Sequence, residues 1–361
     1  MDERQQQALA VKRAMERRFF RKGVTIASLS GVSYGLFTAF LNLGMSSGVW
    51  ATWAAGALSV FALTYIVSAL GSALMYSFSA VWSLGLSALQ GKLGDFFRSL
   101  ASKPGRMIFL AALLGGPIAG TAYVIALQKA GSIVIPISAL NPAIGAILAW
   151  ALYKQKLTVR MLVGIAVCFA ASMMIAGTSL GGDAPEGMFV GVVMAFIAAL
   201  GWGLEGCIAG YSTAMVDYQV GITIRQLVAG FSNLLLVLPL LSVAGGEGAT
   251  YAWQLLGAAL ADGPSLAAFV ASGFFAMFAY SLWYKGNSMC GAALGMAVSG
   301  TYSFWGPFFC WIILGLIVGQ EGWTIPPIGW AAAVVMVIGI FLIAMNPLDL
   351  LKKGEKSHET A

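Results

Sequence analysis

The stretch MFVGVVMAFIAALGWGLEGCIAG, residues 188–210, is apolar along its whole length except for one carboxylate, Glu205. A helix needs about 20 consecutive apolar residues to cross the hydrocarbon core of a bilayer. Such runs recur from residue 23 almost to the end of the 361-residue chain, which is 59% hydrophobic and only 9% charged. A soluble domain carries about 25% charged residues. The sequence therefore predicts an all-α membrane protein.

Hydropathy along the chain predicts ten membrane-spanning helices. They cover residues 24–44, 52–76, 107–128, 133–153, 159–177, 188–210, 222–243, 265–284, 291–317 and 328–346. Two stretches fit this scheme less directly. Residues 77–91 either prolong the second helix or lie along the membrane surface, and residues 249–261 predict a short amphipathic element.

The basic residues fall almost entirely on one side of this arrangement. They gather in residues 1–22, in alternate connections between spans, and in the tail of residues 347–361. Lys and Arg mark the cytoplasmic side of a membrane protein. We therefore expect a bacterial cytoplasmic (inner) membrane location with both termini cytoplasmic, and residues 1–22 are expected to lie there as a basic helix. The net charge of +6 follows from these segments and from contact with lipid head groups, so it calls for no nucleic-acid partner.

The two halves of the chain repeat short motifs in the same order. Residues 23–177 form the first predicted repeat and residues 188–346 the second. The matched segments are GVSYGL (31–36) with ALGWGL (199–204), GPIAGTAY (116–123) with GFFAMFAY (273–280), and NPAIGAILAWALYKQKLT (141–158) with GPFFCWIILGLIVGQEGWT (306–324). Each half holds five spans, and an odd number turns the second copy upside down. Inverted repeats are typical of secondary transporters, whose site lies near the midplane between the repeats.

Glu205 needs a partner, because an ionisable side chain inside a membrane is costly and usually functional. Apart from Arg160, the second residue of the fifth predicted span, Arg225 is the one cation inside a predicted span, and it lies about as far from the bend between spans six and seven as Glu205 does. The two residues could therefore form a structural ion pair or a coupling pair. The second candidate is a cationic ligand, and Glu205 could also exchange a proton.

Aromatic residues near the predicted midplane favour a cationic ligand. Trp202 lies three residues before Glu205, and Tyr34 holds the place of Trp202 in the first repeat. A quaternary ammonium group has no proton to donate, but it binds aromatic faces with about 0.5–2 kcal/mol per ring. Packing in the core or against lipid is the simpler explanation for any one of these rings. The candidate substrate-binding residues are Tyr34, Trp202, Glu205, Tyr280, Tyr302 and Trp305.

The pattern of motifs resembles the drug/metabolite transporter superfamily, of the EamA-like ten-helix kind. The resemblance rests on the Tyr-Gly-Leu and Trp-Gly-Leu motifs of spans one and six, and on the Asn-Pro and Gly-Pro segments of spans four and nine. It extends over residues 24–346. Within that superfamily, three segments are similar to bacterial choline transporters: GPIAG…AGS (116–132), WGLE…IRQ (202–226) and YSFW (302–305). This resemblance implies a carrier for choline or a related quaternary ammonium compound, although Tyr34 stands where that group carries tryptophan.

Two other function classes stay open. A carrier of the same kind could import or export another small metabolite, such as an amino acid, a purine or an amphiphilic drug. A polytopic membrane enzyme is less favoured, because the single histidine, His358, lies in the tail and the four cysteines show no metal-binding spacing. We expect no catalytic residues, no cofactor and no metal, and either a monomer or a homodimer.

Overall fold

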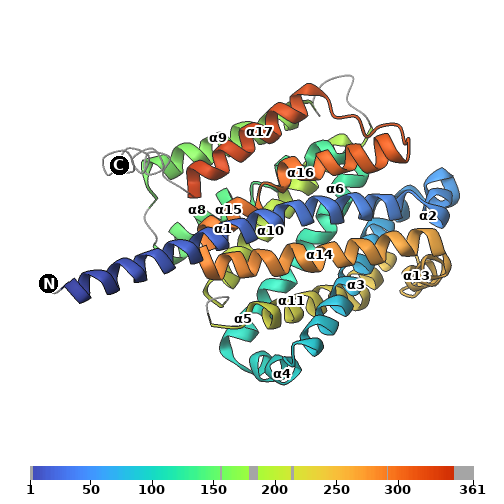
Figure 1. Ribbon diagram of the computed structural model, residues 1–361. Coiled ribbons are helices and arrows are strands. Elements are labelled where there is room, and N and C mark those ends of the chain that lie inside the picture. The colour runs from blue at the N-terminus through green and yellow to red at the C-terminus, as the bar shows by residue number, and fades with distance from the viewer. Residues whose placement is uncertain (1–2, 155–156, 179–185, 213–214, 291, 345–361) are drawn as a thin grey trace.

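The computed structural model describes residues 3–154, 157–178, 186–212, 215–290 and 292–344, and the regular structure in these ranges is helical throughout. Long helices run side by side in one bundle (Figure 1). The predicted tail, residues 347–361, lies outside the described ranges. Helices suit a bilayer because each one satisfies its own backbone hydrogen bonds.

Six helical segments in the described ranges are long and apolar enough to cross a membrane. They are Arg18–Met45, Ala62–Leu89, Lys103–Ser138, Met188–Ala209, Tyr218–Ala244 and Gly263–Met289. Four shorter apolar helices accompany them: Asn141–Leu152, Val159–Ile175, Tyr302–Ile317 and Pro327–Ile343. The chain is an all-helical, membrane-embedded protein.

The described residues of the first half of the chain form thirteen helical elements. They are α1 (Glu3–Met45), α2 (Gly48–Thr52), η1 (Trp53–Ala57), η2 (Ala62–Val67), α3 (Ser68–Leu89), α4 (Leu93–Ala101), α5 (Lys103–Leu113), η3 (Leu114–Gly120), α6 (Thr121–Ala130), η4 (Gly131–Val134), α7 (Ile135–Ser138), α8 (Asn141–Tyr153) and α9 (Val159–Thr178). The basic segment before residue 23 continues into the first span as one helix, because α1 runs unbroken from Glu3 to Met45.

In the second half, the ranges that the structure describes form ten helical elements. They are α10 (Met188–Ser212), α11 (Tyr218–Ser232), η5 (Asn233–Val237), α12 (Leu238–Ala244), α13 (Tyr251–Ala261), α14 (Gly263–Cys290), α15 (Ala292–Ser299), α16 (Tyr302–Cys310), η6 (Trp311–Ile317) and α17 (Pro327–Ala344). Helix α13 is the short element predicted at residues 249–261.

The second membrane helix is displaced from its predicted position. The prediction began it at residue 52, but the long helix begins at Ala62 and continues to Leu89. Residues 77–89 therefore prolong the helix, which was one of the two alternatives. Gly56, with a φ of 110°, breaks the helical conformation of the segment before this helix. The buried Ser83 and Ser87 extend its packing face against α11.

Two predicted spans are interrupted. The fourth contains a turn at Ala139 and Leu140, between α7 and α8. The ninth contains a turn at Gly300 and Thr301, between α15 and α16. Hydropathy does not report such turns because the residues in them are as apolar as their neighbours.

Helix pairs from distant parts of the chain form the bundle. Helix α1 packs along α14 and α16, while α10 packs along α6 and α8. Helix α3 packs on α11, and α9 packs on α17, a pair visible at the top of Figure 1. Small residues allow these close approaches: a side chain at Gly164 would meet the backbone of Gly339, and one at Gly201 would meet Ala119. Such contacts are the usual way helices associate in lipid.

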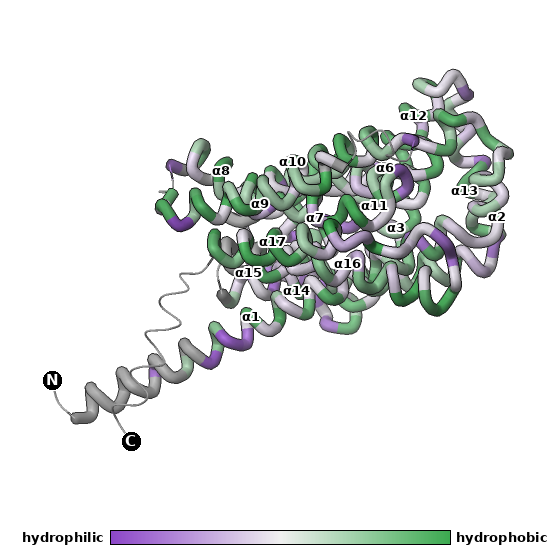
Figure 2. The backbone as a smooth tube through the Cα atoms, turned by 90° about the horizontal axis from the view of Figure 1, so that it is seen from above, coloured by the Kyte–Doolittle hydropathy of each residue, from purple (hydrophilic) through white to green (hydrophobic). Residues whose placement is uncertain are grey.

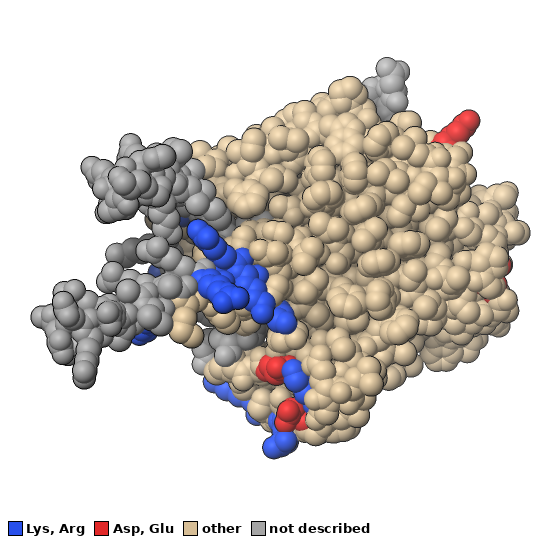
Figure 3. Space-filling model, viewed as in Figure 1, with Lys and Arg blue, Asp and Glu red and all other residues tan. Residues whose placement is uncertain are grey.

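Polar and apolar residues separate along the bundle. Apolar residues dominate its middle, and several hydrophilic segments lie toward its ends (Figure 2). On the face seen in Figure 3, most Lys and Arg side chains gather at the end where α1 begins and α17 ends, and the broad flank carries almost no charge. A charge-free flank is what contact with hydrocarbon requires.

Candidate functional site

A buried ion pair joins α10 to α11. Arg225 donates from Nε to Oε1 of Glu205 at 2.7 Å and from Nη2 to Oε2 at 3.0 Å, and neither side chain has any exposed surface. Nη1 of Arg225 donates to Oε1 of Gln226 at 2.9 Å. The Gln226 amide in turn donates to Oγ of Ser79 on α3. The structure therefore brings together the acid and the cation that the sequence singled out.

Glu205 fits into this place because a glycine faces it. Gly115 lies in the π-helical segment η3, and a methyl group on its Cα would collide with the Glu205 carboxylate. Trp202, one turn before Glu205 on α10, donates from Nε1 to the carbonyl oxygen of Gly115 at 3.0 Å. Pro117, inside the same segment, has no N–H to donate to the helix. This irregular segment supplies both the space and an acceptor for α10.

Two tyrosines face the guanidinium group. Cζ of Arg225 lies 3.8 Å from the ring centroid of Tyr280 and 5.3 Å from that of Tyr76. The two hydroxyls lie 3.3 Å apart. Arg225 therefore already occupies a cation–π position on a ring that the sequence assigned to a ligand. Tyr76 was not singled out from the sequence, where nothing separates it from an ordinary core tyrosine.

A small cavity lies beside this pair. Residues from both halves of the chain line it: Ser30, Tyr34, Asn141, Trp202, Ala279, Tyr280, Trp283, Met296, Ser299, Gly300 and Tyr302. Its volume is about 30 Å³. This is enough for one or two water molecules, whereas sites for small molecules usually offer at least about 300 Å³. As it stands, the cavity is therefore too small for a ligand larger than water.

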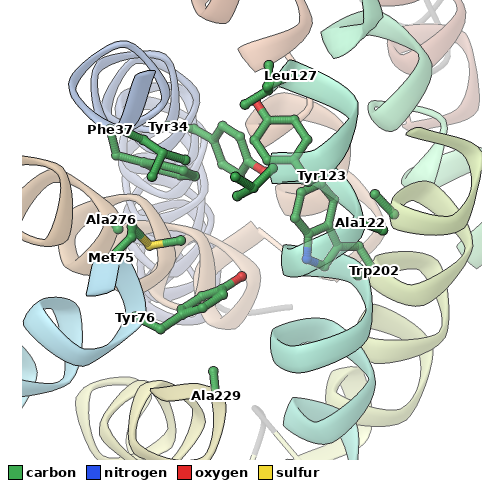
Figure 4. Close-up of a cluster of buried hydrophobic side chains, with 14 of the residues drawn as sticks. Tyr34, Phe37, Met75, Tyr76, Ala122, Tyr123, Leu127, Trp202, Ala229 and Ala276 are labelled. Atoms are coloured by element: carbon green, nitrogen blue, oxygen red, sulfur yellow. The ribbon is translucent and has the colours of Figure 1, made fainter. Parts of the chain in front are cut away.

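Tyr34 is the centre of the aromatic cluster at this cavity. Its ring stacks on Tyr302 with centroids 4.0 Å apart, and meets Trp202 edge-on at 5.9 Å and Tyr280 at 6.3 Å. Figure 4 shows the rings of Tyr34, Tyr123 and Trp202 converging from three helices. Tyr123, whose hydroxyl lies 2.9 Å from Oγ1 of Thr38, is a further member of the cluster. The Tyr34 hydroxyl is buried and has no hydrogen-bond partner among the described residues.

Trp305 does not join this cluster. Its ring is partly exposed and packs against Phe304 and Phe309, and it does not line the cavity. The backbone of Trp305 lies so close to Gly35 that a side chain there would collide with it. This contact fixes α16 with Tyr302 facing inward and Trp305 facing outward. The expectation that Trp305 lines the same space is therefore wrong.

The two helix interruptions meet at the cavity. Asn141 begins the helix after the first turn, and Gly300 belongs to the second, and both line the cavity. Oγ of Ser138, just before the first turn, lies 3.2 Å from the Tyr302 hydroxyl, just after the second. Broken membrane helices expose backbone groups where they face a cavity. The site thus combines aromatic faces with two helix breaks, whose backbone is held by local hydrogen bonds such as that from the Gly300 N–H to the carbonyl oxygen of Met296.

Acidic and metal-ligating side chains are sparse around the cavity in the described part of the chain. Within the ranges that the structure describes, no three His, Cys, Asp or Glu residues lie close enough to share a metal ion. Glu205 has both carboxylate oxygens bonded to Arg225. What the arrangement can do is bind: rings and hydroxyls line a small space, and the ion pair lies against Tyr280, one of the lining rings.

Comparisons with known proteins inform the fold alone. No family model and no curated protein matches the chain. Among solved structures, a crystal structure described only as that of a protein matches 88% of this chain and 94% of its own, with a TM-score of 0.54 at 18% sequence identity. The chain is therefore similar in fold to a protein whose crystal structure is known, and this similarity extends over nearly the whole of both chains.

Proposed function

We propose that the protein is a secondary transporter of ten membrane helices in two inverted five-helix repeats, and that it moves a small cationic metabolite by alternating access. Choline or a related quaternary ammonium compound is the substrate that the aromatic cluster favours. The single observation that carries this proposal is the cavity, because rings from α1, α10, α14 and α16 enclose it at two broken helices.

The pattern of helix contacts supports the inverted repeat. Under the predicted repeat, α1 corresponds to α10, α14 to α6, and α16 to α8. The contacts of α1 with α14 and α16 are then repeated by those of α10 with α6 and α8. The pairs α3–α11 and α9–α17 each join corresponding helices. A pseudo-two-fold axis relates such contacts, and carriers with this symmetry open their central site to either side in turn.

The small volume of the cavity fits a carrier in its closed state. A site of about 30 Å³ must expand before it holds a ligand larger than water. In alternating access the closed conformation separates two open ones. The basic end of the bundle, where α1 begins and α17 ends (Figure 1), supports a bacterial inner-membrane protein with cytoplasmic termini.

A zwitterionic or uncharged metabolite is the second candidate. The ion pair between Glu205 and Arg225 cancels the one charge that would otherwise balance a cationic substrate. Proton transfer to one oxygen of Glu205 would also break at least one of its two bonds to Arg225. Proton coupling through Glu205 would therefore require Arg225 to move first.

Calorimetry on the purified protein tests the proposal. Choline, betaine, a neutral amino acid and a purine are titrated in turn, and we expect choline to bind best. Trp202→Ala should weaken binding at least tenfold, because Trp202 lines the cavity. Trp305→Ala, a matched loss of one indole outside the cavity, should leave affinity within twofold. Tighter binding of the neutral amino acid or of the purine than of choline and betaine would favour the second candidate, and no binding by any of them would refute the assignment.

Uptake into liposomes then tests transport itself. Labelled choline should accumulate in protein-containing vesicles, and Trp202→Ala should reduce the rate. A comparison with and without a pH gradient reports proton coupling. Vesicles that bind choline without moving it would refute the transporter assignment.

A further inference from the structure

The surroundings of Arg225 are those that a bound organic cation would need. A carboxylate, Glu205, accepts two bonds from it, and the face of Tyr280 lies 3.8 Å from Cζ. Tyr76 supplies a second ring at 5.3 Å. All four side chains are buried. The protein thus contains a fully formed cation site whose occupant is one of its own side chains.

This site shares its wall with the cavity. Tyr280 contacts Arg225 and also lines the cavity. Trp202, which lines the cavity too, lies one turn before Glu205 on α10. An entering cation would therefore share one ring and one carboxylate with Arg225. A single buried carboxylate cannot neutralise two positive charges at once.

Arg225 has an acceptor available if it moves. Tyr284 lies one helical turn beyond Tyr280 on α14, and its buried hydroxyl has no hydrogen-bond partner among the described residues. The Tyr284 ring lies against α11 at Gly221, one helical turn before Arg225, where an added Cβ would be 3.4 Å from the ring. Gln226 already holds Nη1 of Arg225, and can remain a partner when the other two nitrogen atoms leave Glu205.

We propose that Glu205, Tyr280 and Tyr76 form a cation subsite that Arg225 fills in the empty protein, and that a carried monovalent cation displaces Arg225 from it. This inference rests on the proposed function for the identity of the carried ion, but the subsite itself does not depend on transport. Arg225 then acts as a tethered competitor. It keeps Glu205 paired when no substrate is bound, and it makes entry depend on a positive charge, since a neutral molecule cannot replace it at a carboxylate.

Removing the competitor provides the test. Calorimetric titration of choline should show at least tenfold tighter binding to Arg225→Gln than to the unmodified protein, and Tyr280→Leu in the Arg225→Gln protein should abolish the gain. Arg160→Gln is the matched control, because Arg160 donates to the carbonyl oxygen of Leu342 between α9 and α17, away from the subsite. Equal or weaker choline binding by Arg225→Gln would overturn the proposal.

Chemical rescue supplies a second measurement that does not depend on choline. Millimolar guanidinium should raise the unfolding temperature of Arg225→Ala and leave that of the unmodified protein unchanged, because the subsite is vacant only in the variant. Arg225→Ala combined with Glu205→Gln should show no rescue. If guanidinium rescues Arg225→Ala while no variant binds choline, the cation subsite stands and the choline assignment falls. An absence of rescue would overturn the subsite.

Discussion

Replacing Gly115 with alanine should separate the ion pair by inserting a methyl group beside it. The new Cβ would fall on the Glu205 carboxylate. The backbone around Gly115 has little freedom to retreat, because the adjacent segment packs closely on α10 where Gly201 meets Leu114 and Ala119. The carboxylate must therefore move, and we expect it to lose at least one of its two bonds to Arg225.

The expected cost follows from these two effects. Overpacking a buried site costs about 1–3 kcal/mol, and a hydrogen bond to a charged group contributes about 1.5–3 kcal/mol. The two effects overlap, because the added methyl group relieves its own strain by breaking a hydrogen bond between Glu205 and Arg225. We therefore expect the free energy of unfolding to fall by about 3 kcal/mol. The free energy of unfolding in mixed micelles, followed by tryptophan fluorescence, measures it.

A glycine elsewhere in the bundle provides the control. Gly85, in α3, has no atom within 4 Å of the position its Cβ would take. Gly85→Ala should be neutral or stabilise the protein by up to about 1 kcal/mol, because alanine is the better helix former. The steric reasoning is checked in a Glu205→Ala background, where the methyl group of Gly115→Ala fills vacated space and should cost less than about 1 kcal/mol. An equal cost in both backgrounds would refute it.

Three further predictions concern other contacts. Glu205→Gln and Arg225→Gln should each lower the free energy of unfolding by about 3–5 kcal/mol, because each leaves a buried charge unpaired. The double variant should lose less than the sum of the two single losses. Additive losses in the same unfolding assay would contradict a direct pair. Tyr34→Phe should change the free energy of unfolding by less than about 0.5 kcal/mol, because the Tyr34 hydroxyl has no hydrogen-bond partner in the described structure. Tyr123→Phe should lower it by about 1 kcal/mol, because the hydrogen bond to Thr38 is lost. A larger loss for Tyr34→Phe than for Tyr123→Phe would show that the Tyr34 hydroxyl is bonded. Hydrogen bonds from Ser265 lower the pKa of Asp262, which lies just before α14. The stabilisation is therefore present above the unfolded pKa of about 3.9 and disappears as the pH falls through the lower folded pKa. The unfolding temperature should exceed that of Asp262→Asn at pH 6 and converge with it only below the folded pKa, and a difference that persists at still lower pH would refute the assignment.

Part of the site followed from the sequence because charges are rare in lipid. Glu205 and Arg225 stood out as the acid and the cation within predicted spans, and a short hairpin limited how far apart they could lie. The sequence could not choose between Arg225 and a ligand as the partner of Glu205. Only the packing of α10 and of α11 on η3 brings the guanidinium group to the carboxylate and to the face of Tyr280.

For the aromatic residues, the sequence could not tell which side chains reach the cavity. Tyr302 and Trp305 lie three residues apart, so both were expected at the cavity, but only Tyr302 reaches it. Helix spacing narrows the direction of a side chain to about one face. Which part of that face points inward depends on a neighbouring helix, here through the contact of Gly35 with the backbone of Trp305.

The amino-acid sequence by itself determined that this chain lies in a membrane as helices, because long apolar runs cannot leave their backbone groups unsatisfied in lipid. It also located most of those helices, since hydropathy is a property of consecutive residues. The tertiary structure decided where the helices break, where the second one begins, and which buried groups meet. Those outcomes depend on contacts between residues far apart in the chain, such as Ser138 with Tyr302 and Glu205 with Arg225, and no local pattern encodes them.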